Sequence, residues 1–144
     1  MSFTHFDLDP RLLHNVRALG FEQPTPIQRE TVPVALKGHD ILGSAETGTG
    51  KTAAYLLPLL QRLLAAHTPA RSPRVLILVP TRELALQVLE HAQQLNRQTN
   101  VRVAAIYGGV GYGDQDEALK RGVDIVVATP GRLLDQVERR KINF

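Results

Sequence analysis

The chain has 144 residues, of which 43% are hydrophobic and 22% charged, as is typical of one globular domain with a buried core. It contains no cysteine, which excludes disulfides, cysteine-ligated zinc and a thiol nucleophile. No apolar run approaches the roughly 18 residues needed to cross a bilayer, and the first residues lack an export signal. These features favour a cytoplasmic protein without a membrane partner. The net charge of +3 permits a nucleic-acid partner without requiring one.

The first elements in chain order are two short helices. Asp9, followed by a proline, predicts a helix start, and an apolar helical face then runs to Gly20. Thr25, also followed by a proline, predicts a second helix that is bent or interrupted at Pro33 and ends near Gly38. The chain therefore opens with a helical segment.

From residue 39 onward, apolar strands alternate with amphipathic helices. The polar residues 67–73 predict a loop. Continuous apolar strands between helices predict an α/β fold, a parallel sheet with helices on both faces. The predicted strands cover residues 40–43, 74–79, 101–107 and 124–128, and the helices that follow them cover 51–66, 82–96, 114–120 and 130–139.

Parallel strands place all their carboxyl ends at one edge of the sheet. Four loops are therefore expected to converge there, over residues 44–51, 80–82, 107–113 and 129–132. Each leads into a helix N-terminus, which presents free N–H donors and a partial positive charge. Such an edge suits a polyanion.

The loop before the third predicted helix has the composition of a phosphate-binding loop. Gly48 and Gly50 permit a tight turn that points backbone N–H groups at phosphate oxygens. Lys51 supplies a positive charge for the phosphates, and the hydroxyl of Thr52 is placed to ligate Mg²⁺. Ala45 departs from the general pattern, which has glycine there. The loop comprises Ala45, Glu46, Thr47, Gly48, Thr49, Gly50, Lys51 and Thr52.

Three further loops carry groups suited to a phosphate backbone, although two of them also have a structural interpretation. Thr81 is a helix N-cap, but capping does not require the neighbouring Arg82. The segment 129–132 likewise reads as an N-cap with proline in the first turn. Bare backbone in the third loop permits close approach to a ligand. The residues concerned are Pro80, Thr81, Arg82, Gly108, Gly109, Thr129, Pro130, Gly131 and Arg132.

Two side chains near the N-terminus suit recognition of a base. Gln28 carries an amide donor and an acceptor, as reading an adenine edge requires. Phe3 is either an aromatic that stacks on a base or a hydrophobic plug for the first helix. The five histidines show no metal-ligand spacing.

These motifs stand together in an order that resembles the DEAD-box RNA helicases, most of all the bacterial members. The resemblance also accounts for Ala45, because this family's phosphate loop begins with alanine. It implies an N-terminal helical segment with an adenine-reading motif over residues 1–38 and a partial RecA-like ATP-binding domain over 39–144. The segments that carry it are 20–28 (GFEQPTPIQ), 45–52 (AETGTGKT), 80–85 (PTRELA), 108–109 (GG) and 129–132 (TPGR).

The resemblance also implies ligands and roles. ATP and Mg²⁺ are the implied cofactors, with Gln28 reading adenine, Phe3 stacking on it and Phe21 beside them. Residues 45–52 would hold the phosphates, with Lys51 and Thr52 in the catalytic machinery. Residues 80–82, 108–109 and 129–132 would grip the RNA sugar-phosphate backbone without regard to sequence.

The departure from the family pattern is the absence of an Asp-Glu-Ala-Asp motif. In this family that motif, the last strands of the first domain and a second RecA-like domain normally follow the point where this chain stops. We therefore expect the N-terminal portion of an ATP-dependent RNA helicase, which alone binds nucleotide weakly without hydrolysis. The alternative is a non-catalytic nucleotide- or RNA-binding module. A different P-loop enzyme, such as a kinase, leaves Gln28 and residues 129–132 unexplained.

Overall fold

A computed structural model of the chain describes residues 1–66 and 72–144. Most of the polar loop expected over residues 67–73 lies outside these described residues. The chain divides into two compact units, Met1–His67 with Gln94–Thr99 and Thr68–Gln93 with Asn100–Phe144. Each unit is described by itself below.

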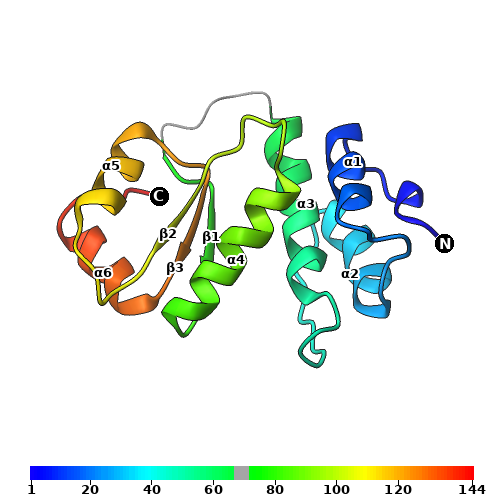
Figure 1. Ribbon diagram of the computed structural model, residues 1–144, viewed down its shortest axis with the longest axis horizontal. Coiled ribbons are helices and arrows are strands. Elements are labelled where there is room, and N and C mark those ends of the chain that lie inside the picture. Colours follow the sequence, from blue (N-terminus) through cyan, green and yellow to red (C-terminus); the bar gives the residue numbers. More distant parts are fainter. Residues whose placement is uncertain (67–71) are drawn as a thin grey trace. The chain divides into compact units, whose positions relative to one another are not determined.

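The first unit is helical, and its helices follow the sequence pattern closely. It contains the short 3-10 helix η1 (Phe3–His5) and the α-helices α1 (Pro10–Ala18), α2 (Pro26–Leu36) and α3 (Lys51–Ala65) (Figure 1). The helix α2 continues through its internal proline instead of being interrupted there. The side chain of Asp9 caps α1 by accepting a hydrogen bond from the backbone N–H of Arg11.

The core of this unit consists of apolar side chains from α1, α2 and α3. Leu12 on α1, Val32 on α2 and Leu57 on α3 are each 0% exposed. Asn15 is buried as well, and its amide donates to the backbone carbonyls of Leu95 at 2.7 Å and Arg97 at 2.8 Å. A buried polar side chain with both bonds made fixes α1 against the end of the helix that begins at Arg82.

The strand predicted over residues 40–43 is wrong for this structure. Residues 39–46 form neither helix nor strand, and the exposed fractions of Ile41 and Leu42 are 43% and 102%. A strand is held by hydrogen bonds to a neighbouring strand. No described strand pairs with these residues, so their apolar character does not produce a strand.

The second unit is built on a parallel sheet of three strands in the order β1-β3-β2, where four strands were expected along the chain. The ladder pairs Val75 of β1 and Val103 of β2 with Ile125 of β3, and it continues in register to Ala128. The elements are β1 (Val75–Leu78), α4 (Arg82–Leu95), β2 (Val103–Ile106), α5 (Gly113–Arg121), β3 (Ile125–Ala128) and α6 (Pro130–Glu138).

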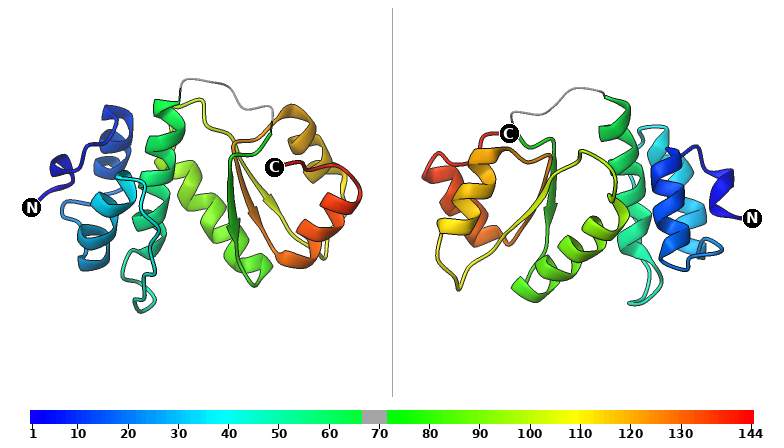
Figure 2. Two further views of the ribbon diagram at one scale, coloured as in Figure 1. Left: turned by 180° about the vertical axis from the view of Figure 1, so that it is seen from behind. Right: turned by 45° about the horizontal axis from the view of Figure 1, so that its top comes forward.

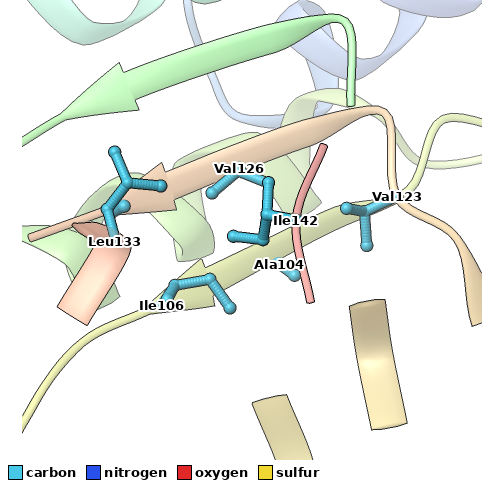
Figure 3. Close-up of a cluster of buried hydrophobic side chains, with 7 residues drawn as sticks. Ala104, Ile106, Val123, Val126, Leu133 and Ile142 are labelled. Carbon is cyan, nitrogen blue, oxygen red and sulfur yellow. The ribbon is translucent and has the colours of Figure 1, made fainter. Parts of the chain in front are cut away.

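The central strand β3 is buried on both faces, and all four of its residues are 0% exposed. On one side of the sheet lie α5 and α6, and on the other lies α4 (Figures 1 and 2). This layering confirms the α/β fold with helices on both faces. The side facing α5 and α6 packs Ala104, Ile106, Val123, Val126, Ala128, Leu133 and Ile142 into one cluster (Figure 3).

Candidate functional site

The predicted phosphate loop has the backbone geometry that its glycines permit. Gly48 and Gly50 both adopt φ +84°, a left-handed conformation that strains other residues. The hydroxyl of Thr49 donates to the carbonyl of Glu46 at 2.6 Å, which closes the turn. Gly50 is the N-cap of α3, so the loop ends at the start of a helix whose first N–H groups are free for an anion.

Lys51 folds back onto its own loop. Its ammonium group donates to the backbone carbonyl of Ala45 at 2.5 Å. The side chain is exposed, so this contact is made in a solvated setting. A phosphate that enters the loop competes with this carbonyl for the ammonium group.

Gln28 is joined directly to the phosphate loop. It is 3% exposed, its Nε2 donates to the carbonyl of Gly50 at 3.1 Å, and its Oε1 accepts from the backbone N–H of Thr25 at 3.0 Å. Two motifs that are 22 residues apart in the sequence therefore meet through one amide group. In this state both the donor and the acceptor of Gln28 are engaged within the protein.

The contact leaves no room for a side chain at Gly50. A Cβ atom there would lie 2.4 Å from the Nε2 of Gln28 and 3.1 Å from the Oγ1 of Thr25. At Gly48, by contrast, a Cβ atom would meet nothing within 4 Å. The loop thus requires glycine at one position for its backbone alone and at the other also for space.

In the structure Phe3 is buried, as in the interpretation that makes it a hydrophobic plug. Phe3 is 5% exposed and packs edge-to-face on Phe6, with ring centroids 5.8 Å apart. Phe21 is 38% exposed. Both phenylalanines line a surface pocket of about 400 Å³ beside α1, and Gln28 is not among its lining residues. Stacking of Phe3 on an adenine remains a prediction.

The sheet brings together three of the four loops expected to converge. Because Leu78 and Ile106 both pair with Ala128, the loops after β1, β2 and β3 leave from one edge of the sheet. The phosphate loop belongs to the other unit and does not follow a strand of this sheet. The part of the expectation that concerns the second unit is confirmed.

The loop after β1 contains both a capping residue, Thr81, and an exposed arginine, Arg82. The hydroxyl of Thr81 accepts from the backbone N–H of Leu84 at 3.2 Å, so it caps α4. Arg82 is exposed, and its guanidinium lies 5.3 Å from the centre of the Tyr107 ring. Gly109 in the neighbouring loop has φ +82°, and a Cβ atom there would be 4.0 Å from an Arg82 nitrogen. Arg82 therefore lies beside the glycine pair.

Arg132 is partly committed to contacts within the protein. It donates to the carbonyl of Val110 at 2.8 Å and to Oε1 of Gln115 at 3.3 Å. These two bonds tie the start of α6 to the loop after β2 and to α5. These bonds use two of the five N–H donors of the guanidinium.

Sequence reasoning missed a group of side chains around Tyr112, whose segment 109–113 looks like an ordinary glycine-rich turn. The hydroxyl of Tyr112 donates to the carboxylate of Asp135, and this bond raises the pKa of Tyr112, as does desolvation. Asp116 pairs with Arg139 at 3.1 Å. Burial opposes ionisation of Asp116, but hydrogen bonds from Gln136 and Arg139 keep its pKa below the usual 3.8. The only sequence signal for this group was the presence of an aromatic residue, Tyr112, inside a glycine-rich turn.

Neither a resident metal site nor a membrane span is found in the part of the chain that the structure describes. No cluster of three or more His, Asp or Glu side chains there is arranged to hold a metal ion. None of its helices combines the length and apolar character that crossing a bilayer requires.

Comparison with known proteins agrees with this geometry. Residues 25–144 match the DEAD/DEAH box helicase family. The ATP-dependent RNA helicase RhlB of Xanthomonas axonopodis pv. citri is 47% identical over 99% of the chain, and SrmB of Escherichia coli is 49% identical over 99%. The crystal structure of the RNA helicase Prp28 from Chaetomium thermophilum bound to ADP matches 99% of the chain with a TM-score of 0.91 and 43% identity.

These matches cover only part of each relative. The chain spans 26% of RhlB, 32% of SrmB and 35% of the Prp28 chain. The likeness to Prp28 extends over nearly all of this chain and establishes the RecA-like fold. The chain belongs to the DEAD/DEAH box helicase family.

Proposed function

We propose that this chain is the N-terminal ATP- and RNA-binding portion of an ATP-dependent RNA helicase. The observation that carries the proposal is the hydrogen bond from Gln28 to the carbonyl of Gly50. It joins a side chain able to read adenine to a loop able to hold phosphates. A loop that served phosphate alone would not need this connection. The ADP bound to Prp28, a relative of the same fold, agrees with it.

The loop suits a nucleoside triphosphate with Mg²⁺. The left-handed glycines and the free N–H groups at the start of α3 form an anion cradle, and Lys51 adds a cation. In this proposal Thr52 would hold Mg²⁺, which would supply positive charge to neutralise the phosphates. Lys51 exchanges the Ala45 carbonyl for a phosphate oxygen. Gln28 would turn its amide toward adenine, and Phe3 and Phe21 are proposed to contact the nucleotide as well.

The sheet edge of the second unit is proposed to hold RNA by its backbone. Arg82 lies beside the glycine pair, and Thr129 in the loop after β3 is the N-cap of α6. Guanidinium and backbone N–H donors on adjacent loops suit phosphate oxygens, and such contacts do not depend on base sequence. Arg132 is proposed to donate to RNA phosphate oxygens as well. The proposed contacts are Pro80, Thr81, Arg82, Gly108, Gly109, Thr129, Pro130, Gly131 and Arg132.

The 144 residues alone are proposed to bind nucleotide weakly without hydrolysing ATP. The sequence contains no Asp-Glu-Ala-Asp motif, so no carboxylate of that motif is present to position water or to hold Mg²⁺ through its waters. In the whole protein a second RecA-like domain would close on the nucleotide and the RNA. A phosphate-release assay on this chain with and without RNA should detect no turnover. RNA-stimulated phosphate release would contradict this part of the proposal.

Binding itself is tested by amide NMR spectra of the isotope-labelled chain. Titration with ADP should shift the amides of residues 45–52 and of Gln28. Titration with oligouridine should shift residues 80–82, 108–109 and 129–132. Absence of either set of shifts at millimolar ligand would refute the corresponding half of the proposal.

A further inference from the structure

The loop after β2 is attached to α6 through the ring of Tyr112. The guanidinium carbons of Arg132 and Arg139 lie 4.2 Å and 3.9 Å from the ring centre, within the range of cation–π interaction. The phenolic hydroxyl donates to Asp135. Two side chains of α6 and that of its C-cap residue, Arg139, thus converge on a single aromatic residue of the neighbouring loop.

The same contacts fix the rest of the loop. Arg132, stacked over Tyr112, donates to the carbonyl of Val110, and it also donates to Gln115. Gln115 is 6% exposed, and its Nε2 donates to the carbonyl of Tyr107 at 2.9 Å. The loop is consequently held at its beginning, its middle and its end.

The guanidinium of Arg139 is held in place by the carboxylate of Asp116. Its two terminal nitrogens donate to the two carboxylate oxygens of Asp116, at 3.3 Å and 3.1 Å. Gln136, which is 0% exposed, donates to the same carboxylate at 3.1 Å. The position of this guanidinium over the ring is therefore fixed by Asp116 of α5 and by Gln136 of α6, whose Oε1 also accepts from Arg139 at 3.0 Å.

We propose that Tyr112 is a positioning residue for RNA binding, whose ring holds Arg132 and the loop over residues 107–113 in one arrangement. This inference rests on the proposed function of the sheet edge. The loop contains four glycines, Gly108, Gly109, Gly111 and Gly113, and a free glycine-rich loop loses much conformational entropy when it is ordered. The Tyr112 ring makes that ordering part of the fold, so RNA meets a preformed surface.

Three variants of the 144-residue chain test the proposal by fluorescence anisotropy with labelled oligouridine. Tyr112→Leu removes the ring but keeps apolar bulk, and Tyr112→Phe keeps the ring but loses the bond to Asp135. Leu134→Ala is the control, because Leu134 lies on α6 and is 63% exposed. If the loop of Tyr112→Leu is competent about a tenth of the time, its RNA affinity falls about 10-fold. Tyr112→Phe and Leu134→Ala should stay within about twofold of wild type.

Two further readouts separate positioning from general damage. The slope of affinity against salt concentration should be unchanged in Tyr112→Leu, because Tyr112 itself touches no phosphate. Amide hydrogen exchange of residues 108–113, measured without RNA, should be faster in Tyr112→Leu and unchanged in Tyr112→Phe. Wild-type RNA affinity or wild-type exchange in Tyr112→Leu overturns the proposal, as does equal weakening by Tyr112→Phe. If the wild-type chain binds no oligouridine, the proposed function fails, and the exchange measurement still decides whether Tyr112 orders the loop.

Discussion

Alanine at Gly50 should destabilise the chain far more than alanine at Gly48. Both residues have φ +84°, so both substitutions place a Cβ atom in the left-handed region. That conformation costs a non-glycine residue about 1–2 kcal/mol. At Gly48 nothing lies within 4 Å of the new atom, so this is the whole expected effect.

At Gly50 the new atom would also lie 2.4 Å from the Nε2 of Gln28. The Gln28 side chain must move and give up its bond to the Gly50 carbonyl, and its amide is buried. A lost hydrogen bond with a buried partner left unsatisfied costs about 1–3 kcal/mol. Gly50→Ala should therefore lower the free energy of unfolding by about 2 kcal/mol more than Gly48→Ala.

Urea unfolding followed by circular dichroism measures both variants against wild type. A double-mutant cycle adds the decisive comparison, because Gln28→Ala removes the atom that obstructs the new Cβ. In the Gln28→Ala background most of the extra cost of Gly50→Ala should be lost, with only the 3.1 Å contact with the Oγ1 of Thr25 left, which gives a coupling energy of about 1–3 kcal/mol. Equal destabilisation by the two glycine variants, or a coupling near zero, would refute the steric argument.

Three other predictions concern separate parts of the chain. Asn15→Ala should lower the free energy of unfolding by about 2–3 kcal/mol, because two carbonyls lose a buried donor; a melting temperature equal to wild type would contradict this. The pKa of Asp9 lies below 3.8, chiefly through its hydrogen bond with Arg11, so its stabilising contribution is present above that pH and is lost as pH falls through the lowered value. Acid titration of Asp9→Asn should show a correspondingly weaker loss of stability, and identical acid curves would exclude the role. Arg82→Gln should weaken oligouridine binding and reduce the slope of log affinity against log salt by about one; an unchanged slope would mean that Arg82 meets no phosphate.

The sequence allowed most of the fold to be predicted because its local signals agree with its packing. Caps and apolar periodicity place α1 and α6 within a residue or two of their observed ends. The strand predicted over residues 40–43 is absent, because the local pattern alone does not decide whether a strand forms. Apolar residues suit a strand, but strand formation depends on a neighbour that a local pattern does not reveal.

The candidate site was predicted in its residue types and less well in its contacts. The glycines and Lys51 predict a phosphate loop because phosphate binding requires these residue types at a fixed spacing. The bond from Gln28 to Gly50 depends on tertiary packing, which spacing does not reveal. Tyr112 was missed because a lone aromatic in a turn has no fixed meaning, and its contacts arise only where Arg132 of α6 and the C-cap residue Arg139 pack on its ring.

Isothermal titration of the chain with ADP and with GDP tests the central claim most directly, namely that Gln28 and the phosphate loop form one adenine-selective site. The account predicts that ADP binds at least about 10-fold more tightly than GDP, since a mismatched pair of hydrogen bonds costs more than about 1.4 kcal/mol. It also predicts that Gln28→Ala abolishes this preference. Equal affinities of the wild-type chain for the two nucleotides would contradict the account.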